Sequence, residues 1–131
     1  MANEGVGALI LVVEEVEETR YGIERLLKVH GYRVELARDE EDAVVRALHR
    51  RPDLILVSLG GQGLNVVATG ERVRQRAELS DEVPIVIFCV QTIAEGAEVK
   101  IGTNVYAARP DNFAQLRRFL SHLLHPLPPR S

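Results

Sequence analysis

The sequence predicts an α/β fold in which five parallel strands form one doubly wound sheet with helices on both faces. Five short apolar runs punctuate the chain, at residues 8–13, 32–37, 53–59, 84–90 and 105–108, and helical patterns lie between them. Strands and helices that alternate in this way form parallel sheets through right-handed crossovers. The length of 131 residues fits a single domain.

The apolar runs differ in how continuous they are. ALILVV, DLILVSL and PIVIFCV are almost uninterrupted in Val, Ile and Leu, as expected of parallel strands that are covered on both faces. YRVELA alternates more, which suits a strand nearer an edge of the sheet. VYAA is the fifth predicted strand.

The first predicted helix covers residues 17–30. Ile23, Leu26 and Leu27 fall at helical spacing within it. Gly31 follows directly and is a natural C-terminal stop.

Two more helices follow along the chain. Asp39 is placed to cap the first of these, and Pro52 closes it. The next, at residues 66–79, is weakened by Gly70. Three arginines in it, Arg72, Arg74 and Arg76, are expected on a solvated face.

The fourth helical slot, residues 92–102, has a poor pattern. It holds two glycines within eleven residues and few large apolar groups, so we expect a short or irregular helix there. The last helix is predicted after Asp111 as its cap, and prolines from Pro126 onward stop it.

Composition limits the classes of function. Net charge is −3 and the pI is about 5.8, which argues against general nucleic-acid binding. The single cysteine, Cys89, permits no intramolecular disulfide and fits a reducing compartment. The stretch MANEGVGALILVVEE lacks the basic start of a signal peptide, and no apolar run has membrane-spanning length. We therefore expect a soluble cytoplasmic protein with no membrane contact.

Ligands of doubly wound folds bind at the carboxyl ends of the strands. The residues to examine there are Glu14 and Glu15, residues 58–61, Cys89 with Val90, and Arg109.

Four segments resemble a response-regulator receiver domain. They are ILVVEEVEETR, RDEEDAVVRALHRRPDLILVSL, VPIVIFCV and GTNVYAARPDNFAQL, in the family's order. The resemblance covers about residues 7–125 of a single domain spanning 1–131, and leaves 126–131 as a tail that would suit the start of a linker. It implies a flavodoxin-like sheet of strand order 2-1-3-4-5. It also implies a role in two-component phosphorelay signalling, with a histidine kinase or an output protein as partner.

The chain departs from the family in its chemistry, which makes it resemble an atypical pseudo-receiver. Receivers carry the phosphoacceptor aspartate at Ser58, usually aspartates at Glu14 and Glu15, Ser or Thr at Cys89, and Lys at Arg109. A carboxylate is ionised without help, whereas a serine hydroxyl needs an adjacent base to attack a phosphoryl group. Ser58 therefore stands at the position of the phosphoacceptor but lacks its carboxylate. The simpler interpretation is a small residue that ends a strand.

Metal binding and a fixed pocket remain alternatives at the acidic pair. Glu14, Glu15 and the carbonyl of Gly60 are weak candidates for Mg²⁺, against solvated acids as the simpler interpretation. We also expect Arg109 to bridge to one of the glutamates and to take the place of an ion.

The resemblance implies an interaction surface rather than an active site. No catalytic set of nucleophile, base and orienting residue can be assembled, so we predict no enzyme. Cys89 and Tyr106 stand at switch-equivalent positions. We expect protein–protein contacts, homodimerisation among them, through a face made of Val90, Ile93, Tyr106, Arg117 and Arg118. The alternatives are a receiver phosphorylated at Ser58 and a small flavodoxin-like ligand binder.

Overall fold

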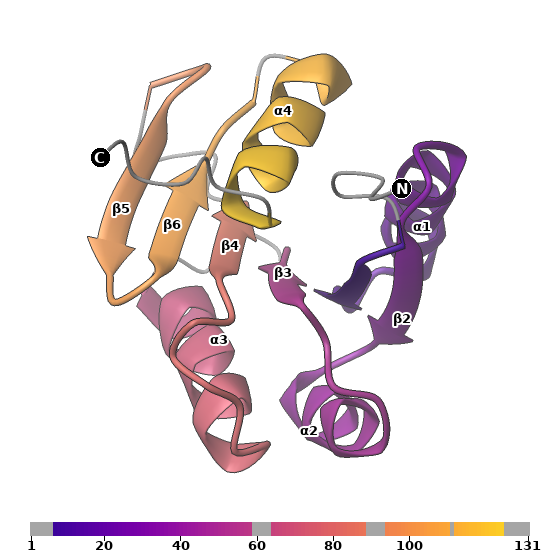
Figure 1. The fold of residues 1–131 in the computed structure, drawn as a ribbon, viewed down its shortest axis with the longest axis vertical. Helices are drawn as coiled ribbons and strands as arrows, with labels where there is room; N and C mark the ends of the chain where they lie inside the picture. Colours follow the sequence, from indigo (N-terminus) through magenta and orange to yellow (C-terminus); the bar gives the residue numbers. More distant parts are fainter. Residues whose placement is uncertain (1–6, 59–63, 89–93, 111, 125–131) are drawn as a thin grey trace, which may run out of the picture.

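The computed structural model describes residues 7–58, 64–88, 94–110 and 112–124. Its sheet has six strands in the order β2-β1-β3-β4-β6-β5 (Figure 1). The strands are β1 (Leu9–Val13), β2 (Arg33–Ala37), β3 (Leu54–Val57), β4 (Ile85–Phe88), β5 (Glu98–Gly102) and β6 (Val105–Ala108). All neighbouring pairs are parallel except β5 with β6, which is antiparallel.

The predicted α/β fold is confirmed, and the five parallel strands have the predicted order when β6 is counted as the fifth. One element is wrong. Where a helix was expected over residues 92–102, the described part forms a turn followed by the edge strand β5. Gly96 has φ +84° in that turn, a conformation that suits glycine and breaks a helix. Val99 and Ile101 then alternate with charged residues, which is the two-residue period of a strand.

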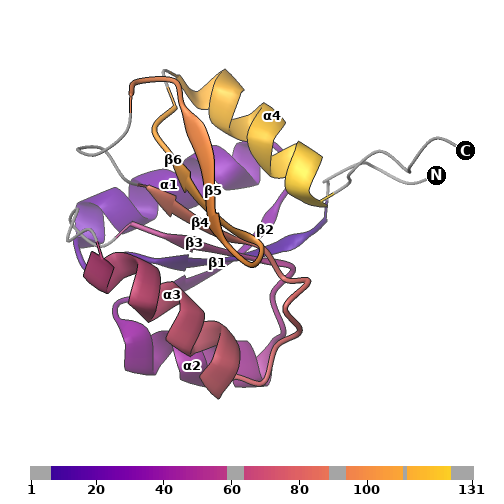
Figure 2. The same ribbon diagram turned by 90° about the vertical axis from the view of Figure 1, so that its left-hand side faces the viewer.

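The helices form one layer on each side of the sheet. Figure 2 shows α1 (Glu17–Val29) and α4 (Phe113–Leu124) on one face, and α2 (Glu40–His49) and α3 (Leu64–Arg76) on the other. Asp39 caps α2 as predicted, because its Oδ1 accepts the Asp42 N–H at 2.8 Å. The predicted cap Asp111 lies outside the described residues. The Asn112 side chain accepts the Gln115 N–H at 2.9 Å at the start of α4. No helix in the described ranges is both long and apolar enough to cross a bilayer.

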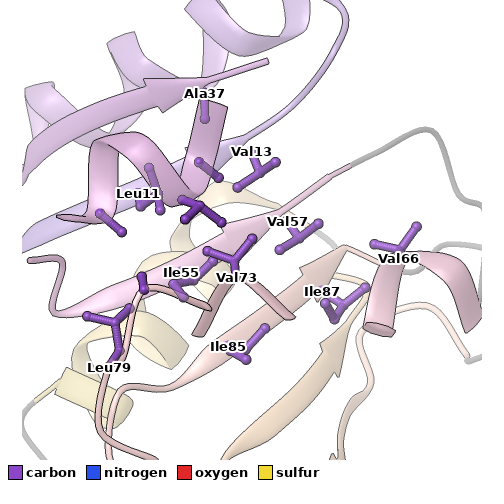
Figure 3. Packing of buried hydrophobic residues seen from close by; sticks show 14 of the residues in the cluster. Leu11, Val13, Ala37, Ile55, Val57, Val66, Val73, Leu79, Ile85 and Ile87 are labelled. Carbon is purple, nitrogen blue, oxygen red and sulfur yellow. The ribbon is translucent and has the colours of Figure 1, made fainter. Parts of the chain in front are cut away.

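Two apolar clusters fill the space between the sheet and its helices. One contains Leu11, Val13, Ile55, Val57, Ile85 and Ile87 with residues of α2 and α3, shown in Figure 3. The other contains Ile10, Val12, Leu54, Leu56 and Val86 with residues of α1 and α4. Successive strand residues point to opposite faces, so the continuous apolar runs are buried on both sides, as predicted.

Gly70 lies where α3 packs closely against the sheet. A Cβ built at this glycine would lie 2.8 Å from Cγ2 of Ile85 and 3.4 Å from Cγ2 of Val57. The glycine that weakens the helical pattern therefore permits close packing of α3 on β3 and β4.

Arg74 is buried, so its assignment to a solvated face is wrong. Its guanidinium donates to the carbonyl of Thr103 at 2.9 Å and to that of Val83 at 3.1 Å. The bond to Thr103 fastens α3 to the turn between β5 and β6, and the bond to Val83 fastens it to the segment that precedes β4. Arg72 and Arg76, in contrast, stay at the surface and bind the carboxylates of Glu40 and Glu41 on α2.

Candidate functional site

The carboxyl ends of β1 and β3 lie side by side. Val13 is in register with Val57, and the Ser58 N–H donates to the Val13 carbonyl at 2.9 Å. Glu14 follows β1, and its N–H donates to the Ala37 carbonyl of β2 at 3.0 Å. The sheet therefore brings Glu14 and Ser58, the acid and the hydroxyl predicted for the site, to neighbouring positions at the edge formed by the carboxyl ends of the strands.

Arg109 lies at the same edge of the sheet. Phe88 is in register with Ala108, so the residue after β6 lies beside the end of β4. Cys89, Val90 and Gly60, three other residues predicted for the site or its neighbouring face, lie outside the described residues, as does Ile93.

The two glutamates have different environments. Glu14 is only 3% exposed, and its Oε2 accepts the Val16 N–H at 2.8 Å. That bond closes the turn that leads into α1. Glu15 is exposed. One acid of the pair is thus held by the backbone, and the other faces solvent.

A cation that the sequence analysis missed supports this turn. Arg20 is buried, and its Nη1 donates to the Glu14 carbonyl at 2.9 Å and to the Glu15 carbonyl at 3.5 Å. Its guanidinium carbon also lies 5.4 Å from the centroid of the Tyr21 ring, within cation–π range. A signal was present, because Arg20, Ile23 and Leu27 have the spacing of one inward helix face.

Arg109 takes part in the β5–β6 hairpin through its backbone. Its N–H donates to the Ala97 carbonyl at 3.0 Å, and its carbonyl accepts the Gly96 N–H at 2.6 Å. Arg109 is half-buried and has a further interaction besides these two bonds. The predicted bridge to Glu14 or Glu15 stays a prediction.

The donors for a metal ion are fewer than the receiver resemblance implies. Ser58 supplies a hydroxyl where a carboxylate would stand, and one Glu14 oxygen already accepts a backbone N–H. The described ranges contain no cluster of three His, Cys, Asp or Glu side chains suited to a metal ion. These residues fit the Mg²⁺ site of a receiver poorly, because this ion prefers several oxygen ligands in octahedral geometry. Weak Mg²⁺ binding that involves the Gly60 carbonyl stays a prediction.

Tyr106 faces a groove between β5, β6 and α4. Its hydroxyl donates to Oδ1 of Asn104 at 3.0 Å, and its ring lies edge-on to that of Phe119 at 5.7 Å. The groove encloses about 730 Å³, and Arg118 is among its lining residues. Two members of the predicted interaction face therefore share one groove.

Arg117 belongs to a different surface of α4. Burial raises the pKa of the Tyr32 hydroxyl, and the positive charge of Arg117 partly opposes that rise. Arg117 therefore acts toward Tyr32, which packs with α1 and β2 residues in one apolar cluster.

The fold and this edge define a class: a doubly wound domain with an acid after its first strand and a polar residue after its third. Comparison with known proteins points to one family within that class. Response regulator MprA of a Mycobacterium species is 28% identical over 117 residues, which cover 88% of this chain and 50% of that protein. Protein PilH of Pseudomonas aeruginosa is 30% identical over 80 residues, which cover 61% of this chain and 65% of that protein. The chain spans about half the length of the MprA proteins that it matches. No family model matches.

Solved structures lead to the same family. The receiver domain of sensor histidine kinase PA1611 from Pseudomonas aeruginosa has a TM-score of 0.68 and 29% identity, over 91% of this chain and 98% of that one. A magnesium ion is coordinated in the active-site cleft of that protein. Chemotaxis protein CheY4 of Vibrio cholerae has a TM-score of 0.68 at 21% identity, over 90% and 99% of the two chains, and shows likeness of fold. These similarities support a response-regulator receiver domain of two-component signalling.

Proposed function

We propose that this chain is a pseudo-receiver, a signalling domain that acts through protein–protein contacts without conventional aspartyl phosphorylation. The observation that carries the proposal is Ser58, a neutral hydroxyl at the end of β3 and beside the buried Glu14. Its partners would be a histidine kinase or an output protein, met in the cytoplasm.

The surroundings of Ser58 support the loss of phosphoryl chemistry. Phosphoryl transfer needs a nucleophilic oxygen in line with the donor and charge neutralisation around the phosphoryl group. A serine hydroxyl becomes such a nucleophile only with a base that accepts its proton. The neighbouring Glu14 carboxylate is tied to the Val16 N–H, which weakens it as that base.

The binding role falls to surfaces away from this edge. The groove is lined by Tyr106 and Arg118, two residue types that are each enriched in protein interfaces. Glu98 and Lys100 of β5 line it on one side. This groove is formed by β5 where receivers have a helix, so its partners need not be those of an ordinary receiver.

The test is intact-mass measurement after incubation with acetyl phosphate and Mg²⁺. We expect no phosphoryl adduct on the natural chain. Ser58→Asp, which returns an ionised oxygen, should gain one phosphoryl group, and the uncharged isostere Ser58→Asn should gain none. An adduct on the natural chain that Ser58→Ala removes would instead establish a receiver phosphorylated at serine.

The interaction role is tested on the groove separately. Tyr106→Ala and Arg118→Ala should each weaken capture of a histidine kinase or output protein from the native cell. Arg25→Ala, on the exposed surface of α1, is the control and should leave capture unchanged. Equal capture by all three variants would contradict the assignment of this surface.

A further inference from the structure

Among the strands of the described residues, β5 is the last of the sheet on its side, and only β6 pairs with it. The Ala97 carbonyl points toward β6, because it accepts the Arg109 N–H. The pairing of β5 with β6 is regular from Glu98 to Lys100, and a register shift follows between Lys100 and Gly102. Backbone groups alternate in direction along the regular part, so those of Val99 face β6 as well, and those of Glu98 and Lys100 face away. Figure 2 looks onto this edge, with β5 in the foreground.

The side chains of this strand alternate in charge and polarity. Glu98 and Lys100 line the groove on the α4 side, and Val99 lies between them with 40% of its surface exposed. The Glu98 carboxylate accepts one bond from Nε2 of Gln115 at 3.3 Å. Within the described ranges, Lys100 has no side-chain hydrogen bond or ion pair.

We propose that two copies of this chain pair antiparallel along β5, with Val99 of one copy opposite Val99 of the other. In this register Glu98 lies opposite Lys100 of the second copy, and two-fold symmetry repeats the contact. The outward backbone groups of these residues then exchange hydrogen bonds as two narrow pairs. The exposed valines meet at the axis.

Charge selects this register over its neighbours. If Lys100 stood on the axis, it would face Lys100 of the second copy. If Glu98 stood there, two glutamates would face each other. Like charges directly opposite destabilise a strand pair, and opposite charges stabilise it. Only the register centred on Val99 gives two attractive pairs.

The pairing is closed because each copy has a single β5. An isologous contact uses the same edge on both copies and stops at a dimer. Pairing also removes the exposed edge that would otherwise be open to aggregation. The dimer does not depend on whether the chain accepts a phosphoryl group.

Sedimentation equilibrium on the full chain tests the dimer and its register together. Because a short strand pair buries little surface, the titration should extend to about 500 μM. We expect a dimer whose dissociation constant rises at least about tenfold in Glu98→Lys and in Lys100→Glu. The double variant Glu98→Lys/Lys100→Glu restores opposite charges and should regain the natural dissociation constant. Glu18→Lys, which makes the same charge change on α1, is the control and should dimerise as the natural chain does.

Two further measurements locate the contact. The amide protons of Glu98 and Lys100 should gain protection from exchange as concentration rises, and that of Val99, bonded within the hairpin, should not. In a Cys89→Ser background, Val99→Cys should form a disulfide-linked dimer, because residues at the axis stand close enough to bridge. Ile101→Cys is the matched control, since its two thiols would be four strand positions, roughly 14 Å, apart.

Several outcomes would overturn the proposal. They are a monomer throughout the titration, a double variant that fails to regain the dimer, and a dimer in which the Glu98 and Lys100 amides exchange freely. Efficient cross-linking through residue 101 but not 99 would equally exclude this register.

Discussion

The two edges of the sheet have similar sequences and different surroundings. At one edge, β2 places Arg33 and Glu35 on either side of Val34; at the other, β5 places Glu98 and Lys100 around Val99. Both triplets are self-complementary in an antiparallel pair. Charge alternation in the sequence therefore does not tell which edge is available.

Contacts within the chain distinguish the two edges. The Glu35 carboxylate lies 3.9 Å from Nη1 of Arg46 in α2 and 3.8 Å from Nη1 of Arg50, the residue after α2. Nε of Arg33 donates to the Gly7 carbonyl at 2.7 Å. Helices α1 and α2 both pack against β2, whereas β5 has its extensive contacts with β6. The charges of β2 thus have charged or backbone partners within the chain, whereas in β5 Glu98 accepts one bond from Gln115 and Lys100 has no side-chain hydrogen bond or ion pair with another described residue.

The largest expected effect comes from releasing the β5 edge from α3. Arg74→Met keeps much of the side-chain volume but removes the bonds that Arg74 donates to the carbonyls of Thr103 and Val83. It also removes a 3.5 Å bond to the Asn104 carbonyl, which still accepts the Ile85 N–H. We expect a loss of about 3 kcal/mol in the free energy of unfolding, typical of lost bonds to a buried charged group. Urea unfolding at a protein concentration too low for dimerisation measures it.

Arg72→Met is the matched control for that change. It removes an arginine of the same helix that donates to the Glu40 carboxylate at 2.8 Å and to the Thr69 hydroxyl at 3.4 Å. Its effect should be much smaller, because solvated ion pairs contribute little. Equal losses in the two variants would show that Arg74 does not anchor the hairpin.

The next largest effects on the free energy of unfolding are expected from replacing two helix glycines, Gly70 in α3 and Gly22 in α1. The two replacements should have opposite signs. Gly70→Ala should cost about 1–2 kcal/mol, because the new methyl group would press α3 away from Ile85 on β4. Gly22→Ala in α1 meets nothing within 4 Å and should stabilise the chain by about 0.5–1 kcal/mol through helix propensity. Thermal or urea unfolding of both variants separates close packing from propensity. A stabilising Gly70→Ala would contradict the close approach of α3.

Much of the fold could be predicted from sequence because its signals are local. The continuous Val, Ile and Leu runs give the central strands, and Asp39 before Glu40 gives the start of α2. The prediction for residues 92–102 was wrong because a helix was expected there from the regular alternation of strands and helices along the rest of the chain. The alternation from Glu98 to Ile101 is a strand signal in itself.

The site was harder to predict, because it depends on how the chain turns. Glu14 and Ser58 could be placed at one edge by counting strands. The burial of Glu14 and its bond to the Val16 N–H depend on the shape of the turn into α1. No pattern of residues in the sequence predicts that shape. Arg74 looked like one of three surface arginines, and only the position of the β5–β6 turn shows what it binds.

A smaller, pH-dependent effect is expected where α2 meets α3. Hydrogen bonds from Arg72, with help from Arg76, hold the pKa of Glu40 below its ordinary value of 4.5. Because the pKa of Glu40 is lower in the folded state, its ion pairs stabilise the fold fully at a pH above the unfolded-state pKa. This stabilisation is lost as the pH falls through the lowered folded-state pKa. Glu40→Gln should therefore cost about 1 kcal/mol or less at neutral pH. The difference between Glu40→Gln and the natural chain, followed by urea unfolding from pH 7 to pH 3, should shrink toward the acid end; a constant difference would contradict the linkage.

The smallest expected effect is on the dimer when the β2 edge is altered. Arg33→Glu makes the same kind of charge reversal as Lys100→Glu, in a triplet of the same pattern. If β2 is engaged within the chain, this variant should leave the dissociation constant of the dimer within about twofold of the natural one, because residues this far apart act independently. Sedimentation equilibrium on Arg33→Glu and Lys100→Glu at matched concentrations makes the comparison. A dimer weakened by Arg33→Glu and unaffected by Lys100→Glu would assign self-association to β2 and show that the ion pairs of Glu35 do not close that edge.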